Sequence, residues 1–79
     1  MGSDRTLYAL ARRIKQLRLD KGISQEELAH RSGLSRTGMG FLETSKRWPR
    51  LDTLMKVADG LSISVDELLN GLHKPSKRR

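Results

Sequence analysis

The residues best suited to chemistry lie near the middle of the chain, at the start of a predicted helix. They are Ser35, Arg36 and Thr37, and they follow a tight turn at residues 32–34 that contains Gly33. A short turn with glycine can hold two helices at a steep angle, so that the second helix projects. The major groove of B-DNA admits one such helix, and side chains near its N-terminus reach the base edges. The pattern therefore predicts a helix that reads DNA.

Two helices are predicted before this turn. Apolar residues recur at spacings of three and four from Thr6 to Asp20, which predicts an amphipathic helix. Ser24 and Glu27 match a capping box, in which the Ser24 hydroxyl accepts from the Glu27 amide and the Glu27 carboxylate reaches back to the Ser24 amide. A short second helix is expected from this cap to about Arg31.

Three more helices are predicted after the turn. Ser35 is the expected cap of the third, which extends to Glu43 and contains two glycines, each costing about 1 kcal/mol relative to alanine. A loop over residues 44–50 precedes a fourth helix at about 52–60, and Ser64 begins a fifth that ends near Asn70. The sequence therefore predicts an all-α domain of five short helices over residues 5–71, followed by a basic, disordered tail at residues 72–79.

Composition limits the classes of function. Lys and Arg number 16 against 9 Asp and Glu, and the net charge of +7 predicts a polyanionic partner. The chain has no cysteine, and its two histidines, His30 and His73, are far apart in sequence, so we expect no enzyme activity, metal site or cofactor. No apolar run suits a membrane span or a secretion signal. We expect a cytoplasmic, nucleoid-associated protein with no membrane contact and no small-molecule ligand.

The middle of the chain resembles a known family of DNA-binding proteins. It is similar to the helix-turn-helix of the phage repressor and Cro family, also called the xenobiotic-response-element family, over about residues 7–71. The run from Ser32 to Thr37 is most similar to the small controller proteins of restriction-modification systems. The resemblance implies a lambda-repressor-like fold and a transcriptional regulator that binds double-stranded DNA. The segments that carry it are Ser24-Gln25-Glu26-Glu27-Leu28-Ala29, Ser32-Gly33-Leu34-Ser35-Arg36-Thr37, Phe41-Leu42-Glu43 and Arg47-Trp48-Pro49-Arg50.

The resemblance implies base contacts from the third helix. Arg36 is the main candidate, because a guanidinium can donate two hydrogen bonds to guanine O6 and N7, worth about 1–3 kcal/mol of discrimination; the alternative is a phosphate contact. Thr37 could bond a base or pack its methyl group on a thymine, and Phe41 could contact thymine or belong to the core. Related proteins often have DNA-touching side chains where this chain has Gly38 and Gly40, so part of the reading surface is expected to be bare.

The resemblance also implies contacts to the DNA backbone. Gln25 lies at the start of the second helix, where its amide and the helix dipole both favour an anion. Ser35 could combine its capping role with a phosphate contact, and Lys46, Arg47 and Arg50 are expected to meet phosphates from the following loop. The alternatives are an ordinary exposed glutamine and a solvated basic loop.

Two residues are assigned to the architecture instead. In the resembling family, an arginine at the position of Arg18 pairs with the glutamate that closes the recognition helix, which is Glu43 here.

Trp48 could pack over the core, stack on a ligand or lie near the two-fold axis of a dimer. We expect a homodimer with recognition helices about 34 Å apart, because so short a chain has a small core and because Leu69 and Leu72 could be exposed.

A second class of function shares the same fold. The chain could be an antitoxin-like or coactivator-like protein-interaction module whose contacts with DNA are secondary. The two classes differ in their response to salt, because binding dominated by phosphates weakens steeply as salt rises, whereas an apolar protein interface responds weakly.

Overall fold

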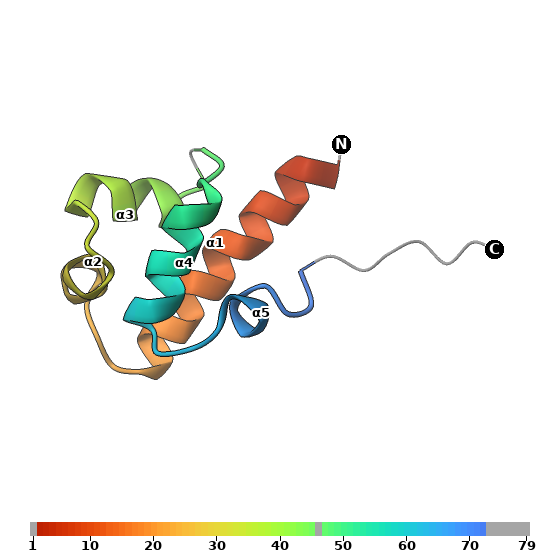
Figure 1. Cartoon of the computed structure of the whole chain (residues 1–79). Coiled ribbons are helices and arrows are strands. Elements are labelled where there is room, and N and C mark those ends of the chain that lie inside the picture. Colours follow the sequence, from red (N-terminus) through yellow and green to blue (C-terminus); the bar gives the residue numbers. More distant parts are fainter. Residues whose placement is uncertain (1, 46, 73–79) are drawn as a thin grey trace.

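The computed structural model describes residues 2–45 and 47–72, with side chains described from Arg5 onward. The described residues form helices and connecting turns, with no strand among them, and the predicted all-α fold of five helices is confirmed. No described helix is both long and apolar enough to cross a membrane. Figure 1 shows the arrangement of the five elements, which are α1 (Gly2–Asp20), α2 (Gln25–Ser32), α3 (Arg36–Glu43), α4 (Leu51–Gly60) and α5 (Val65–Leu68).

Two helix boundaries differ from the prediction by more than one residue. α1 begins at Gly2 rather than Thr6, because the apolar periodicity starts only at Leu7 and cannot mark turns that bury no apolar side chain. α5 ends at Leu68 rather than near Asn70. Its last carbonyls accept hydrogen bonds from Arg13 of α1, which donates from Nε to Leu68 O at 2.8 Å and from Nη2 to Glu67 O at 2.6 Å. A cation from a distant helix therefore stabilises this C-terminus.

Serine hydroxyls begin three of the helices, as predicted. The Oγ atoms of Ser24, Ser35 and Ser64 each accept a backbone N–H from the first turn, at 2.9–3.0 Å. The second half of the capping box predicted at Ser24 is wrong. The Glu27 carboxylate accepts from Arg31 Nε at 2.9 Å, one turn further along α2, instead of reaching back to the cap.

One apolar core lies where the five helices meet. Leu69 and Leu72, which could have been exposed at a dimer contact, are instead half-buried and pack against this core. The reason is that the short α5 lies against α4 and is tied to α1, which turns the following residues inward. The largest fully buried side chains are Ile14, Leu28, Met39, Val57, Leu61 and Leu68.

The closest approach in the core is between α2 and the end of α4. A Cβ atom on Gly60 would lie 3.2 Å from Leu28 Cδ1 and 3.2 Å from the Ser32 nitrogen, and it would collide with Ser32 Oγ. Ser32 is buried, and its backbone nitrogen, which is fixed within α2, is one of the close neighbours, so rotating the hydroxyl away would not relieve the whole contact. The packing of α2 on α4 therefore requires a residue without a side chain at position 60.

Gly60→Ala should lower the free energy of unfolding by about 1–3 kcal/mol, because the added methyl group overpacks the contact between α2 and α4. Gly40→Ala is the matched control, since a Cβ there meets nothing within 4 Å and the change should stabilise α3 by up to about 1 kcal/mol. Urea denaturation of both variants checks this. Equal stabilisation by the two changes would contradict the close approach of α4 to α2.

Candidate DNA-binding surface

The turn between α2 and α3 sets the direction of the candidate recognition helix. Gly33 adopts the left-handed conformation with φ of 69°, which favours glycine, and its N–H donates to His30 O at 3.2 Å. The next amide, of Leu34, donates to Ala29 O at 2.9 Å, which closes the end of α2. In Figure 1, α2 is seen nearly end-on while α3 runs across the view, so the two helices meet at a steep angle. This arrangement is typical of a helix-turn-helix.

The first turn of α3 presents the predicted base-reading residues to solvent. Arg36 and Thr37 are exposed, whereas Met39 and Leu42, further along the helix, are buried. Ser35 is exposed as well, and its hydroxyl oxygen accepts a hydrogen bond from the Gly38 amide at 2.9 Å. The structure thus brings the three residues together at one exposed helix end. Their predicted contacts to bases and phosphate remain predictions.

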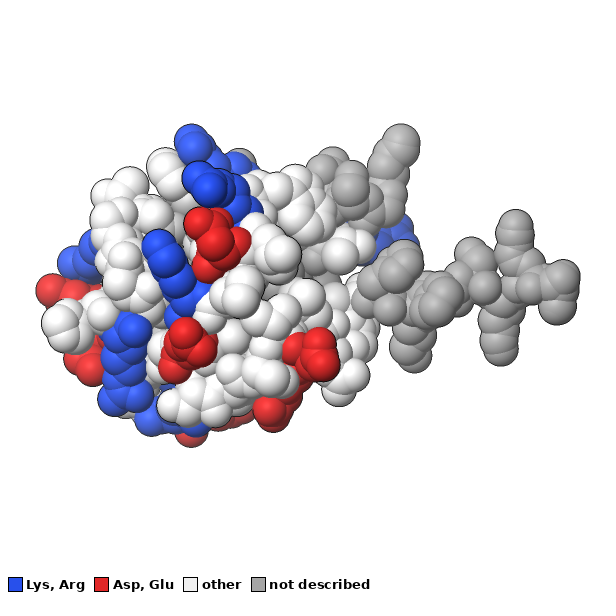
Figure 2. Space-filling model, viewed as in Figure 1, with Lys and Arg blue, Asp and Glu red and all other residues white. Residues whose placement is uncertain are grey.

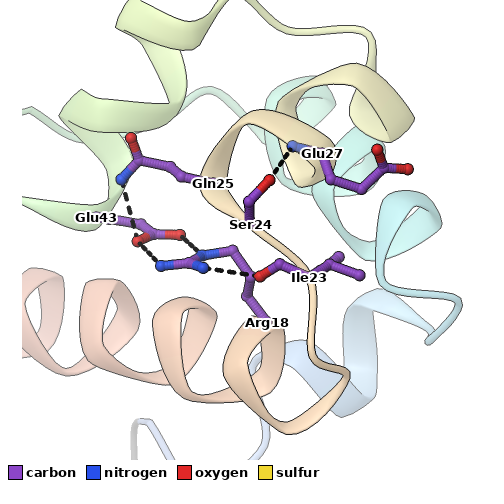
Figure 3. Close-up of polar contacts among 6 residues, drawn as sticks. All are labelled: Arg18, Ile23, Ser24, Gln25, Glu27 and Glu43. Carbon is purple, nitrogen blue, oxygen red and sulfur yellow. Dashed lines mark hydrogen bonds and ion pairs between the residues drawn. The ribbon is translucent and has the colours of Figure 1, made fainter.

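The other end of α3 is fixed by a buried ion pair, which is drawn in Figure 3. Arg18 Nε donates to Glu43 Oε2 at 2.8 Å and Nη2 donates to Oε1 at 3.1 Å, so the pair expected from the resemblance forms with two-point geometry. The side chains are 10% and 3% exposed. The hydrogen bond to Glu43 raises the pKa of Arg18 above its ordinary value, against the opposing effect of burial, so the guanidinium stays charged.

The ion pair also joins the helix that precedes the turn. Arg18 Nη1 donates to Ile23 O at 2.9 Å, and Gln25 Nε2 donates to Glu43 Oε1 at 3.3 Å. Gln25 is half-buried at the first position of α2, and the predicted alternative of an ordinary exposed glutamine is wrong. One carboxylate therefore connects α1, α2 and α3. The predicted phosphate contact of Gln25 remains a prediction.

A shallow groove follows α3 and is lined partly by residues of the next loop. Phe41 is half-buried and lies outside the core cluster, so its alternative role as a core residue is wrong. The Arg47 guanidinium carbon lies 4.8 Å from the centre of the Phe41 ring, within the range of a cation–π contact. Trp48 is 48% exposed and does not pack over the core. The groove has a volume of about 350 Å³ and contains Phe41, Arg47 and Trp48 together with Leu34, Gly38, Leu42, Pro49, Arg50 and Thr53.

The remaining predicted contacts divide between described and undescribed residues. Arg50 is exposed beside the groove, with its Nε 3.3 Å from Asp52 Oδ1. Lys46 and residues 73–79 of the predicted basic tail lie outside the described residues. Among the residues that the structure describes, no group of three or more His, Cys, Asp or Glu side chains could hold a metal ion.

Two glycines leave part of α3 without side chains. Nothing lies within 4 Å of a Cβ atom built on Gly40, and a Cβ on Gly38 would meet only Ser35 Oγ, at 3.2 Å. Neither glycine has the positive φ that other residues avoid. The free protein thus gives no steric reason for glycine at position 40.

The face that carries α4 has a mixed charge. Figure 2 shows the face that carries α4, where basic and acidic side chains are interspersed with uncharged surface. The net charge of +7 is therefore not concentrated on this face. A mixed surface of this kind attracts a polyanion less strongly than a basic one.

Comparison with known proteins agrees with the fold and the site. The chain belongs to the helix-turn-helix family, whose profile matches residues 14–68. It is 43% identical over 61 residues to YonR of Bacillus subtilis, a prophage-derived uncharacterized HTH-type transcriptional regulator, covering 77% of this chain and 56% of YonR. It is 42% identical over 60 residues to the control protein C.SmaI of Serratia marcescens, covering 76% of this chain and 71% of C.SmaI. For YonR the chain thus spans little more than half of the relative's length, and for the transcriptional activator BcrR of Enterococcus faecalis only 29%.

Solved structures of restriction-modification controller proteins are also similar. C.AhdI from Aeromonas hydrophila superposes with a TM-score of 0.76 at 40% identity, covering 78% of this chain and 94% of C.AhdI. Wild-type C.Esp1396I superposes with a TM-score of 0.74 at 34% identity, covering 81% and 87% of the two chains. The resemblance to this family is therefore confirmed.

Glu43→Gln should lower the free energy of unfolding by about 3 kcal/mol or more, because it leaves the buried Arg18 charge without its counter-ion. Glu27→Gln is the matched control: it removes a carboxylate from an exposed pair with Arg31 and should change stability by less than about 1 kcal/mol. Chemical denaturation of both variants measures the difference. Similar losses in the two variants would mean that the buried pair does not hold α3.

Proposed function

We propose that this chain binds double-stranded DNA at specific sequences and regulates transcription, with α3 entering the major groove. The observation that carries the proposal is the exposure of Arg36 and Thr37 on the first turn of a helix whose far end is fixed by a buried ion pair. A helix held rigidly in this way can present polar side chains to base edges with little loss of entropy. The names of the similar proteins, which are transcriptional regulators and controller proteins, support the same function.

Each side chain of the surface has a distinct role on DNA. Arg36 donates two hydrogen bonds to a guanine, and Thr37 and Phe41 contact neighbouring bases. Arg47 already lies over the Phe41 ring, which places a cation beside the base-contacting residue. The residues that hold phosphates are Gln25, Ser35, Lys46, Arg47 and Arg50.

Arg36→Ala should weaken binding to the preferred site by about 1–3 kcal/mol while changing the affinity for random DNA much less, since the lost bonds are specific to one base pair. Arg50→Ala should instead weaken both by the same factor, because phosphates are the same in every sequence. The measurement is fluorescence anisotropy on a site selected from a random DNA pool. Arg31→Ala is the charge-matched control. Arg31 lies in the last turn of α2, at the other end of that helix from Gln25, and pairs with Glu27.

Uniform losses in both Arg36→Ala and Arg50→Ala would contradict the division between reading and positioning. The salt dependence of the native protein tests the wider proposal. Its affinity for DNA should fall with a slope of about −0.9 per neutralised phosphate on logarithmic axes. A flat dependence would favour a protein-interaction module.

We infer that the chain acts as a homodimer through an apolar patch beside the DNA surface. The patch consists of Trp48, Leu51 and Met55, which are 48%, 65% and 52% exposed. Leu51 and Met55 are one helical turn apart on α4, and Trp48 precedes them in the loop, so the three side chains can form one continuous surface. Exposed apolar patches of this kind are typical of protein interfaces, and a small core gains stability from association.

Met55→Asp should shift the protein from dimer to monomer, because it places a charge in the apolar contact, and should weaken DNA binding by removing the second half-site. Analytical ultracentrifugation over a range of concentrations measures the change. Tyr8→Asp is the control, since Tyr8 is equally exposed at 57% but lies on α1. A native protein that stays monomeric both with and without DNA would contradict the proposed homodimer.

A further inference from the structure

The outer face of α1 carries a row of side chains that neither the core nor the proposed DNA surface uses. All of them are exposed, and they are separated alternately by three and four residues, so they share one side of the helix. Tyr8 and Leu19 are 57% and 51% exposed, and their separation of 11 positions makes about three turns, which aligns them along the axis. We call this row the outer α1 face; it consists of Arg5, Tyr8, Arg12, Lys15 and Leu19.

The two large apolar residues in this row are aligned on one face of α1 and are not scattered over the surface. Of the five exposed large apolar side chains that the structure describes, three belong to the patch of Trp48, Leu51 and Met55. The other two are Tyr8 and Leu19, and both fall on the same line of α1. Single exposed apolar residues need no explanation, but two large apolar residues aligned on one helix face are typical of a contact surface.

The outer α1 face is shaped as well as exposed. Two shallow hollows of about 490 and 400 Å³ flank it, and Tyr8, Arg12 and Gln16 line both of them. The Arg12 guanidinium carbon lies 5.8 Å from the centre of the Tyr8 ring, so the two side chains form one ridge between the hollows. In Figure 1, the N-terminal part of α1 extends beyond the other helices.

The charge of this face is positive along its length. Arg5, Arg12 and Lys15 supply three cations. Two acidic groups with described side chains line its hollows. Glu43, 3% exposed, is paired with Arg18, whereas Asp20 accepts a hydrogen bond from the neutral Gln16 at 2.9 Å and keeps its charge. Arg12 and Lys15 therefore lie between the two apolar residues, and the unpaired carboxylate of Asp20 follows at the C-terminal end of α1.

We propose that the outer α1 face docks an acidic amphipathic helix of a partner protein. Alternating spacings of three and four are those of a helix–helix seam, in which side chains of one helix enter hollows on the other. The apolar residues of the partner pack on Tyr8 and Leu19, and its Asp and Glu residues pair with Arg12 and Lys15. This docking does not depend on the DNA-binding function of α3.

Two other occupants fit the face less well. A second copy of this chain would bring the same cations together, and like charges in contact oppose association. A DNA backbone would accept Arg5, Arg12 and Lys15, and the Tyr8 hydroxyl could donate to a phosphate, but phosphate contacts give no role to Leu19. An acidic amphipathic helix uses Leu19 as well as Tyr8, Arg12 and Lys15.

The test is binding of a synthetic three-heptad peptide with leucine at the a and d positions and glutamate at most others. The control peptide has the same composition in a scrambled order that destroys the apolar seam. The full chain should bind the first peptide at least about tenfold more tightly than the second, measured by fluorescence anisotropy. The amide resonances that shift on binding should be those of α1, with α3 unaffected.

Variants separate the apolar part of the contact from the electrostatic part. Tyr8→Ala with Leu19→Ala should remove the difference between the two peptides, and Arg12→Gln with Lys15→Gln should weaken binding of both. Lys56→Gln is the matched control for charge, because Lys56 is exposed on α4, and it should leave the preference between the two peptides unchanged. Circular dichroism checks that each variant keeps its helices.

Two results would overturn the docking proposal. Equal affinity for the two peptides would show that the face offers only charge attraction. Loss of DNA affinity in the Arg12→Gln, Lys15→Gln variant, by the same factor on preferred and random DNA, would assign the face to the DNA backbone instead. The proposed DNA reading by α3 is tested separately by Arg36→Ala, so the failure of one leaves the other standing.

Discussion

The position of α3 depends on one buried carboxylate. Glu43 accepts two hydrogen bonds from Arg18 and one from Gln25, and Arg18 in turn donates to the Ile23 carbonyl. Three helices that are separate in sequence are thereby joined at a single point. Burying an ion pair contributes little net stability, because desolvation opposes the attraction, but a mispositioned α3 would leave a buried charge unpaired. The pair thus acts mainly on the orientation of α3, which is the property that base reading needs.

This fixed point matters because α3 is weak as an isolated helix. It has eight residues, and Gly38 and Gly40 lie within it. A helix this short with two glycines is not stable alone in water. Met39 and Leu42 bury its inner side, Ser35 caps one end and Glu43 holds the other, so α3 is a product of tertiary contacts. The position of the exposed first turn accordingly depends on the core beneath it.

Sequence reasoning predicted the features that local rules control. The five helices, the three serine caps and the turn at Gly33 follow from periodicity, capping and glycine conformation, and the partner of Arg18 followed from the family resemblance. It did not find features that arise only when distant segments meet. Arg13 binds the carbonyls that end α5, and Gly60 lies against α2; neither contact leaves a periodic signal. The inward packing of Leu69 and Leu72 has the same origin. The roles of individual side chains on DNA also depend on a partner that the chain alone does not contain.

The two glycines of α3 affect the specificity of the proposed DNA binding. Each weakens the helix by about 1 kcal/mol relative to alanine, yet a Cβ at Gly40 would meet nothing in the free protein. The open space at Gly40 can therefore matter only in a complex, where a second molecule fills it. In the proposed complex with DNA, a bare stretch of α3 would allow the backbone to approach the duplex more closely than a side chain permits. Arg36 would then supply most of the direct reading, and uncontacted base pairs would contribute through the shape and stiffness of the DNA.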